Sequence, residues 1–130
     1  FSKDLVIMKT VIFCFILFFN NPNSLEDLIT SLEIRSSEEI SNYFDSNSEI
    51  IINEKSSKGN KFQLTKTLDN FFTENNLREF KIIHKGDTQN NIIYMLAEYS
   101  SNDDIYKVFL TLLKAEKKYI IQKFKIDIRE

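Results

Sequence analysis

The 130-residue sequence is poor in the residues that build covalent or metal-bound sites, with one cysteine, one histidine and no tryptophan. Because Cys14 has no second cysteine to pair with, the core has to hold the fold without a disulfide. Only Gly59 and Gly86 provide glycine freedom, and no phosphate-binding loop is present. No Ser-His-Asp order, HExxH motif or metal-ligand cluster occurs. We therefore expect no metal, no cofactor and no standard catalytic motif.

The charge of the chain is nearly balanced, with 17 basic and 19 acidic residues and a formal net charge of −2. Lys3, Lys9 and Asp4 fall within residues 1–24, and without that segment 15 basic and 18 acidic residues remain, a net charge near −3. Nucleic-acid-binding domains concentrate basic residues on one face. The run Lys114-Ala115-Glu116-Lys117-Lys118 is instead typical of a polar turn, so we expect no nucleic-acid partner.

Residues 1–24 resemble a secretory signal peptide. Lys9 follows Met8, and nine apolar residues, Val11 to Phe19, come next. Nine helical residues span about 14 Å, well short of the roughly 30 Å of a bilayer core. Met8 looks like the natural start, so we interpret residues 1–7 as a spurious prefix. These features predict an exported protein, either periplasmic or secreted.

Two other interpretations of this segment stay open. It could be a buried N-terminal element of a cytosolic protein, or an uncleaved anchor that tethers the protein to a membrane, because no small-x-small cleavage site precedes Ser24. The remaining residues, 25–130, are enough for one hydrophobic core but not for two domains. We expect a single domain there.

Hydrophobic periodicity predicts two short helices, a strand and a turn, a third helix, and then four successive strands. Ser24 and then Ser36 or Ser37 precede acidic residues, as at helix N-termini, and apolar residues recur at helical spacing after Phe62. Successive β-rich runs separated by short polar turns indicate an antiparallel meander and an α+β fold. The expected strands are residues 49–53, 79–85, 92–99, 105–113 and 119–128, with a turn or short hairpin at 54–60.

Several motifs resemble a known family. They are Tyr43-Phe44, residues 68–72 (LDNFF), 80–86 (FKIIHKG), 106–109 (YKVF) and 120–126 (IIQKFKI). This pattern is similar to the nuclear transport factor 2-like (cystatin-like) superfamily, and more closely to a small exported bacterial family, domain of unknown function 4783. The likeness runs from about Leu25 to Ile128. It implies a curved antiparallel sheet wrapped around about three helices as a cone with an open mouth, and it implies no particular activity.

Strand alternation selects the candidate site residues, because the concave face of such a cone lines its pocket. Phe80, Ile82 and His84 share one face of their strand, and Gln122 and Phe124 share one face of the last strand. His84 and Gln122 would then be polar groups on an apolar inner surface. The candidate ligand-binding residues are His84, Gln122, Tyr94, Tyr106, Phe80 and Phe124.

Three functional hypotheses follow. The first is a non-enzymatic binding module that holds a small apolar ligand in the cone, or a protein partner on the sheet. The second is a small hydrolase or isomerase in which His84 acts as general acid or base. A structural His84, hydrogen-bonded to Gln122 or a backbone carbonyl, is the favoured explanation of this residue, and ligand contact is the next. The third is a structural homodimer subunit, as is common in the superfamily, joined through Ile83, Phe109 and Ile121 on the outer sheet face.

Overall fold

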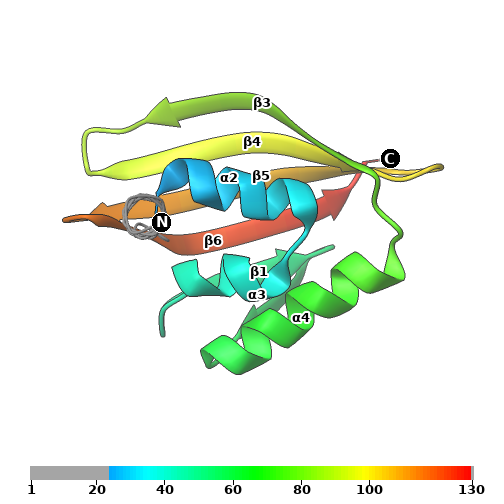
Figure 1. Cartoon of the computed structure of the whole chain (residues 1–130), viewed down its shortest axis with the longest axis horizontal. Coiled ribbons are helices and arrows are strands. Elements are labelled where there is room, and N and C mark those ends of the chain that lie inside the picture. Colours follow the sequence, from blue (N-terminus) through cyan, green and yellow to red (C-terminus); the bar gives the residue numbers. More distant parts are fainter. Residues whose placement is uncertain (1–23, 130) are drawn as a thin grey trace, which may run out of the picture.

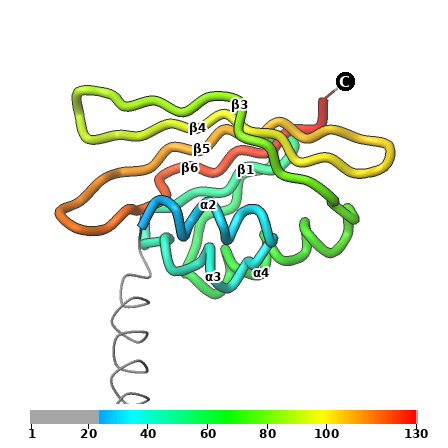
Figure 2. Tube along the Cα trace, turned by 45° about the horizontal axis from the view of Figure 1, so that its top comes forward, coloured from blue at the N-terminus to red at the C-terminus, as the bar shows by residue number. Residues whose placement is uncertain are grey.

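The computed structural model describes residues 24–129, and its helices lie together on one face of a six-stranded curved sheet (Figures 1 and 2). The predicted export segment therefore lies outside the described residues, apart from Ser24. Within the described part, no helix combines the length and apolar character needed to cross a membrane. The α+β, cone-like fold expected from the sequence is confirmed.

Each α-helix begins at a capping residue that the sequence contains. The hydroxyl of Ser24 accepts a hydrogen bond from the backbone at the start of α2, and that of Ser36 does so for α3. Asn60 and Gln63 form a reciprocal capping box at the start of α4. Local residues thus determine where the helices start. The helices are α2 (Leu25–Ile34), α3 (Ser37–Ile40), the 3-10 helix η1 (Ser41–Tyr43) and α4 (Lys61–Glu74).

The strands form one sheet in the order β2-β1-β6-β5-β4-β3. The last four are joined by short turns as an antiparallel meander, as expected. Together they present an alternating apolar face to the helices. The strands are β1 (Glu49–Ile52), β2 (Lys55–Lys58), β3 (Glu79–Asp87), β4 (Ile92–Ser100), β5 (Ile105–Ala115) and β6 (Lys118–Ile128).

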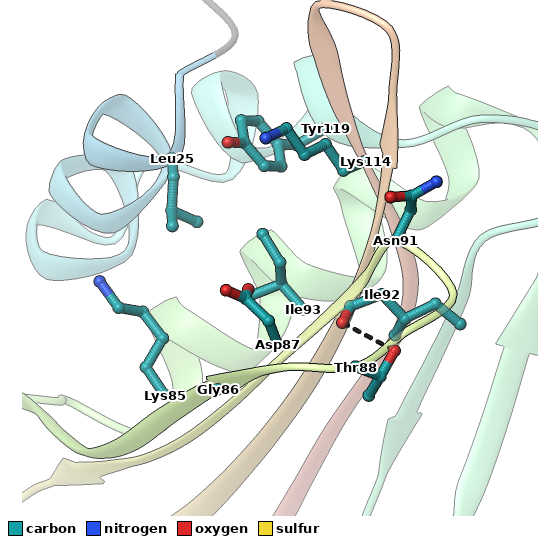
Figure 3. A pocket seen from close by; sticks show the side chains of 10 residues that line it. All are labelled: Leu25, Lys85, Gly86, Asp87, Thr88, Asn91, Ile92, Ile93, Lys114 and Tyr119. Carbon is teal, nitrogen blue, oxygen red and sulfur yellow. Dashed lines mark hydrogen bonds between the residues drawn. The ribbon is translucent and has the colours of Figure 1, made fainter.

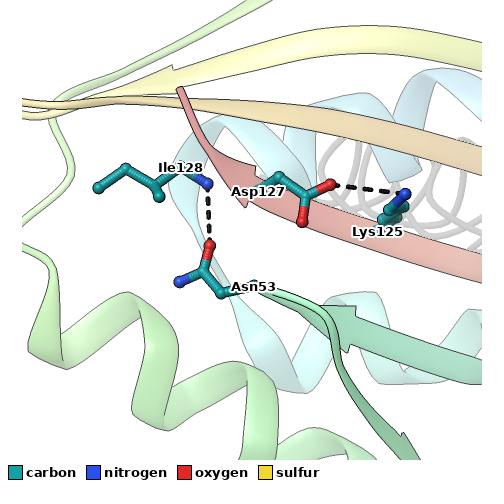
Figure 4. Close-up of polar contacts among 4 residues, drawn as sticks. All are labelled: Asn53, Lys125, Asp127 and Ile128. Carbon is teal, nitrogen blue, oxygen red and sulfur yellow. Dashed lines mark hydrogen bonds and ion pairs between the residues drawn. The ribbon is translucent and has the colours of Figure 1, made fainter. Parts of the chain in front are cut away.

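The sheet is mixed rather than wholly antiparallel, which corrects the sequence-based expectation. Strand β1 pairs with β6 in parallel, with Ile50 opposite Phe124. Both side chains are fully buried, so the pairing completes the core. Asn53 joins the end of β1 to β6 through two hydrogen bonds. Its backbone N–H donates to the Ile126 carbonyl. Its side-chain oxygen accepts from the Ile128 N–H at 2.9 Å (Figure 4).

The core fills the space between the helices and the concave face of the sheet. Leu28 and Leu32 of α2 and Leu64 and Leu68 of α4 are at most 1% exposed. They pack in one cluster with the inward residues of the long strands, among them Met95, Leu110 and Phe124. Truncating a leucine in such a core costs about 2–5 kcal/mol, so this layer supplies much of the stability.

Tyr99 connects the end of α2 to β4. Its buried hydroxyl donates a 2.7 Å hydrogen bond to the Leu32 carbonyl. Its ring packs between Phe72 and Phe80, with ring centroids 5.5 Å and 4.8 Å away. At the other end of α2, the Tyr43 hydroxyl donates to the Ser24 carbonyl at 2.9 Å. Tyrosine hydroxyls thus hold both ends of the helix over the sheet.

These tyrosines predict a loss of stability in alkali. Burial, together with the carboxylates of Asp27 and Glu39, raises the pKa of Tyr43 to about 12. Burial, opposed by the Arg35 guanidinium, also raises the pKa of Tyr99. In the unfolded chain both groups ionise near pH 10. Unfolding above that pH therefore releases protons, and the free energy of unfolding falls as the pH rises toward the folded-state pKa values.

Urea denaturation followed by circular dichroism, between about pH 7 and pH 11, measures this decline. At neutral pH, Tyr99→Phe lowers the free energy of unfolding by about 0.5–1.5 kcal/mol, because the Leu32 carbonyl loses one of its two donors and keeps the Arg35 backbone N–H at 3.3 Å. Above pH 10 the variant's decline is shallower, since one fewer proton is released on unfolding. Equal slopes for the two proteins would contradict this explanation.

The turn between β1 and β2 gives a second prediction. Asn53 and Glu54 form a two-residue turn with φ values of 48° and 72°, a region that favours glycine. We expect Glu54→Gly to raise the free energy of unfolding by about 0.5–1 kcal/mol. Glu54→Ala keeps the Cβ atom and is the matched control without that gain. If alanine stabilises the protein as much as glycine in thermal unfolding, relief of backbone strain is not the cause.

Candidate functional site

A cavity of about 470 Å³ opens at one end of the concave face, next to the β3–β4 turn and the β5–β6 hairpin (Figure 3). We call it the mouth cavity. In Figure 3, side chains from the β3–β4 side face Leu25 of α2 and Tyr119 of β6 across the opening. The residues that give it its chemistry are Leu25, Lys85, Asp87, Ile93, Lys114 and Tyr119.

A β-bulge turns the charged residues of β3 toward this cavity. Ile82 pairs with Ala97 and His84 pairs with Leu96, so Ile83 is an extra residue in the strand. After the bulge, Lys85 pairs with Met95, which is fully buried on the concave face. Asp87 follows two residues later and shares that face. Without the extra residue, both charged side chains would point to the outer face.

A second β-bulge, in β6, turns Tyr119 toward the mouth cavity. Thr111 pairs with Lys123 and Leu112 pairs with Ile121, so Gln122 is the extra residue. Ile121 is fully buried, and Tyr119, two residues earlier, lies on the same concave side. Tyr119 pairs with Lys114 at the end of β5, which brings an aromatic ring and an ammonium group together at the mouth.

The charged groups of the mouth cavity are not neutralised by one another. The described residues contain two ion pairs, and neither involves Lys85, Asp87 or Lys114. The three side chains are solvent-exposed at the opening, whereas Ile93 below them is only 7% exposed. The cavity therefore combines an apolar floor with unpaired charges of both signs at its rim. That combination suits a small molecule with apolar and charged parts.

The side chains at the mouth offer hydrogen-bond donors and acceptors. Within residues 24–129, no group of three histidine, cysteine, aspartate or glutamate side chains lies close enough to hold a metal ion. Lys85, Lys114 and the Tyr119 hydroxyl offer donors, and the Asp87 carboxylate offers an acceptor. These groups can recognise a ligand through hydrogen bonds and charge.

His84 and Tyr94 lie together, but on the outer face of the sheet. His84 Nε2 is 3.1 Å from the Tyr94 hydroxyl, and both residues are at the surface. Tyr94 packs closely over Gly86, where an added Cβ would be 2.5 Å from the tyrosine oxygen. The expectation that His84 faces the concave side was wrong, because the bulge at Ile83 reverses the alternation.

The other candidates lie apart from the mouth cavity as well. Gln122 is exposed at its bulge, and Ile121, expected on the outer face, takes the inward position instead.

The three remaining aromatic candidates outside the mouth cavity pack within the protein. Phe124 is fully buried, and Phe80 packs against Tyr99. Tyr106 is 5% exposed, and its hydroxyl donates a 2.9 Å hydrogen bond to Asn75 Oδ1. Burial raises the pKa of Tyr106, and the Asp104 carboxylate raises it further. A ligand-binding role for these residues stays a prediction.

Sequence reasoning missed every charged residue of the mouth cavity. The available signal was a break in alternation: Ile82-Ile83 and Ile120-Ile121 each put two apolar residues in a row within an alternating strand. Such a pair marks a place where a bulge can reverse the two faces. Lys114 continues the inward series of Leu110 and Leu112 and was assigned to a turn.

Solved structures with this fold are numerous, and the similarity extends over most of the chain. A nuclear transport factor 2-like protein of unknown function from Silicibacter pomeroyi is 14% identical, with a TM-score of 0.60 over 81% of this chain and 92% of that one. The fold is therefore of the nuclear transport factor 2-like class. Among curated proteins, none matches this sequence.

Two structures from Bacteroides are more similar. The DUF4783 family protein of Bacteroides uniformis is 22% identical, with a TM-score of 0.74 over 83% of this chain and 99% of that one. That of Bacteroides ovatus is 23% identical, with a TM-score of 0.72 over 79% and 93%. Residues 25–127 match the family described as a domain of unknown function, DUF4783, and the chain belongs to that family.

Proposed function

We propose that this protein is a non-enzymatic binding module whose ligand occupies the mouth cavity. The observation that carries the proposal is the contrast within that cavity: Lys85, Asp87 and Lys114, which form no ion pair within residues 24–129, surround a floor made by Ile93 and Leu25. A few polar groups around an apolar surface are the usual composition of a small-molecule site. The volume of about 470 Å³ is also in the usual range for such sites.

The expected ligand is amphiphilic rather than purely apolar. The deeper part of the cone is occupied by the protein's own side chains, since Leu28, Met95 and Phe124 are fully buried there. A ligand at the mouth therefore meets apolar groups on one side and ammonium or carboxylate groups on the other. An apolar tail alone would leave the charged rim without partners, so we expect the ligand to carry charge.

The predicted export segment, residues 1–24, supports a role outside the cytoplasm. A hydrolase or isomerase using His84 has less support. The His84–Tyr94 pair lies on the outer face, and neither side chain lines the mouth cavity. A catalytic pair has to reach its substrate within a shared site.

Binding at the mouth can be tested with 1-anilinonaphthalene-8-sulfonate, an amphiphilic anion whose fluorescence rises in apolar surroundings. We expect saturable binding by the wild-type protein and an affinity about tenfold lower in Lys114→Glu, because the substitution replaces an attractive charge by a repulsive one. Lys107→Glu is the matched control, since Lys107 is an exposed lysine of the same strand that does not line the mouth cavity.

Equal losses in the two variants, or no saturable binding, would overturn the proposal. Mass spectrometry of small molecules extracted from the purified wild-type protein provides an independent readout. Recovery of an amphiphilic compound from the wild-type protein but not from Lys114→Glu supports the proposal. Recovery of the same compound from the wild-type protein and from Lys114→Glu opposes it.

A second candidate function is self-association through the outer sheet face. Leu96 pairs with His84 on one side and Phe109 on the other, so apolar groups of neighbouring strands lie together there. Leu96 is 39% and Phe109 37% exposed, and Ile83 beside them is 53% exposed. Adjacent exposed apolar residues on a sheet mark a surface that a partner can cover. We propose that a second copy of the chain covers this one.

Light scattering at several protein concentrations tests this self-association. The wild-type protein should approach twice the monomer mass, and Phe109→Lys should remain monomeric because it places a charge in the contact. Phe62→Lys is the control, since Phe62 is 76% exposed on α4, away from this face. A monomeric wild type, or equal dissociation of the two variants, would refute the dimer.

A further inference from the structure

The mouth cavity carries charges of both signs. Lys114, beside Tyr119, contributes a positive charge from the β5–β6 side, and Lys85 contributes another from β3. Asp87 lies two residues beyond Lys85 on the same side of the strand, and its carboxylate points into the cavity in Figure 3. Positive and negative groups thus line the same open cavity.

None of these groups has a partner within the described part of the chain. Lys85, Asp87 and Lys114 form no ion pair, and the Asp87 carboxylate and the Tyr119 hydroxyl make no hydrogen bond there. Opposite charges on neighbouring strands can pair, and Arg129, just after β6, pairs in this way with Glu98 of β4 at 3.3 Å. The mouth charges are therefore available to a ligand.

We infer that the mouth cavity binds a zwitterion with apolar side chains, of the class of short peptides with free ends. This inference rests on the proposed function, because it names the ligand class of the same cavity. The Asp87 carboxylate receives the ligand's ammonium group, and Lys85 and Lys114 receive its carboxylate. The apolar side chains contact Leu25, Ile93 and the Tyr119 ring.

A simple anion fits this arrangement less well than a zwitterion does. A site for an anion alone is served by cations, and the Asp87 carboxylate would repel an anionic ligand. A simple cation has the reverse difficulty, because it would meet two lysines. Only a ligand with both charges gives every charged group a partner of opposite sign. Two bound ends also limit the ligand to a short chain, in keeping with the cavity volume of about 470 Å³.

Three matched probes test the inference by isothermal titration calorimetry on the whole protein. Leucyl-leucine carries both charges, N-acetyl-leucyl-leucine lacks the ammonium group, and leucyl-leucinamide lacks the carboxylate. The measurement is made at low ionic strength, because salt screens charges that are exposed at the rim. We expect leucyl-leucine to bind about tenfold more tightly than either blocked peptide.

Substitutions in the protein assign each charge to its partner. Asp87→Asn should lower the affinity for leucyl-leucine to that of the N-acetyl peptide, while binding of the N-acetyl peptide is kept or improved. Lys114→Gln should reduce the preference for a free carboxylate, because Lys85 alone then receives it. Asp103→Asn, in the exposed β4–β5 turn away from the mouth, is the control and should bind all three probes as the wild-type protein does.

The possible results separate this inference from the proposed function. Equal affinities for the three peptides, or a free-amine preference that survives Asp87→Asn, overturn the zwitterion assignment. If 1-anilinonaphthalene-8-sulfonate still binds in a Lys114-dependent way, the proposed binding function of the mouth cavity stands although the zwitterion assignment fails. If neither the peptides nor the sulfonate probe binds at the mouth, both proposals fail.

Discussion

The apolar concave face of the sheet has to be shielded from water, and the rest of the structure follows from how the helices shield it. Leu28 and Leu32 of α2 and Leu64 and Leu68 of α4 reach the inward side chains of the long strands. Helix α2 begins only at Leu25, however, while β3 and β5 extend past it to their turns. The mouth cavity lies where the covering layer formed by the described helices ends and the sheet continues. The core and the candidate site are therefore two parts of the same face.

The local features of this fold could be predicted from sequence, and the pairing features could not. Ser24, Ser36 and Asn60 cap helices through hydrogen bonds to residues three positions away, so a short window contains the whole interaction. The parallel pairing of β1 with β6 joins residues more than seventy positions apart, for example Ile50 and Phe124. Hydrophobic alternation indicates that such strands exist but not which edge an early strand joins.

The candidate site was missed for the same reason. A bulge is defined by the partner strand, which shows that Ile83 and Gln122 are extra residues. Alternation counted along β3 alone assigns His84 inward and Lys85 outward, and one extra residue exchanges the two. Histidine also attracts attention as a reactive residue, whereas lysines near a turn look like ordinary surface residues. The charged residues of the cavity can be identified only when the pairing register of the strands is known.

The bulge at Ile83 has a further consequence, because β3 is the outermost strand on its side of the sheet. A long, regular outer strand offers a row of free backbone groups to which another chain can add by strand pairing, the first step of many aggregates. The extra residue interrupts that row, and Lys81 and Lys85 flank the interruption. The distortion that points charges into the cavity thus also makes the open edge of the protein a poor template for uncontrolled polymerisation.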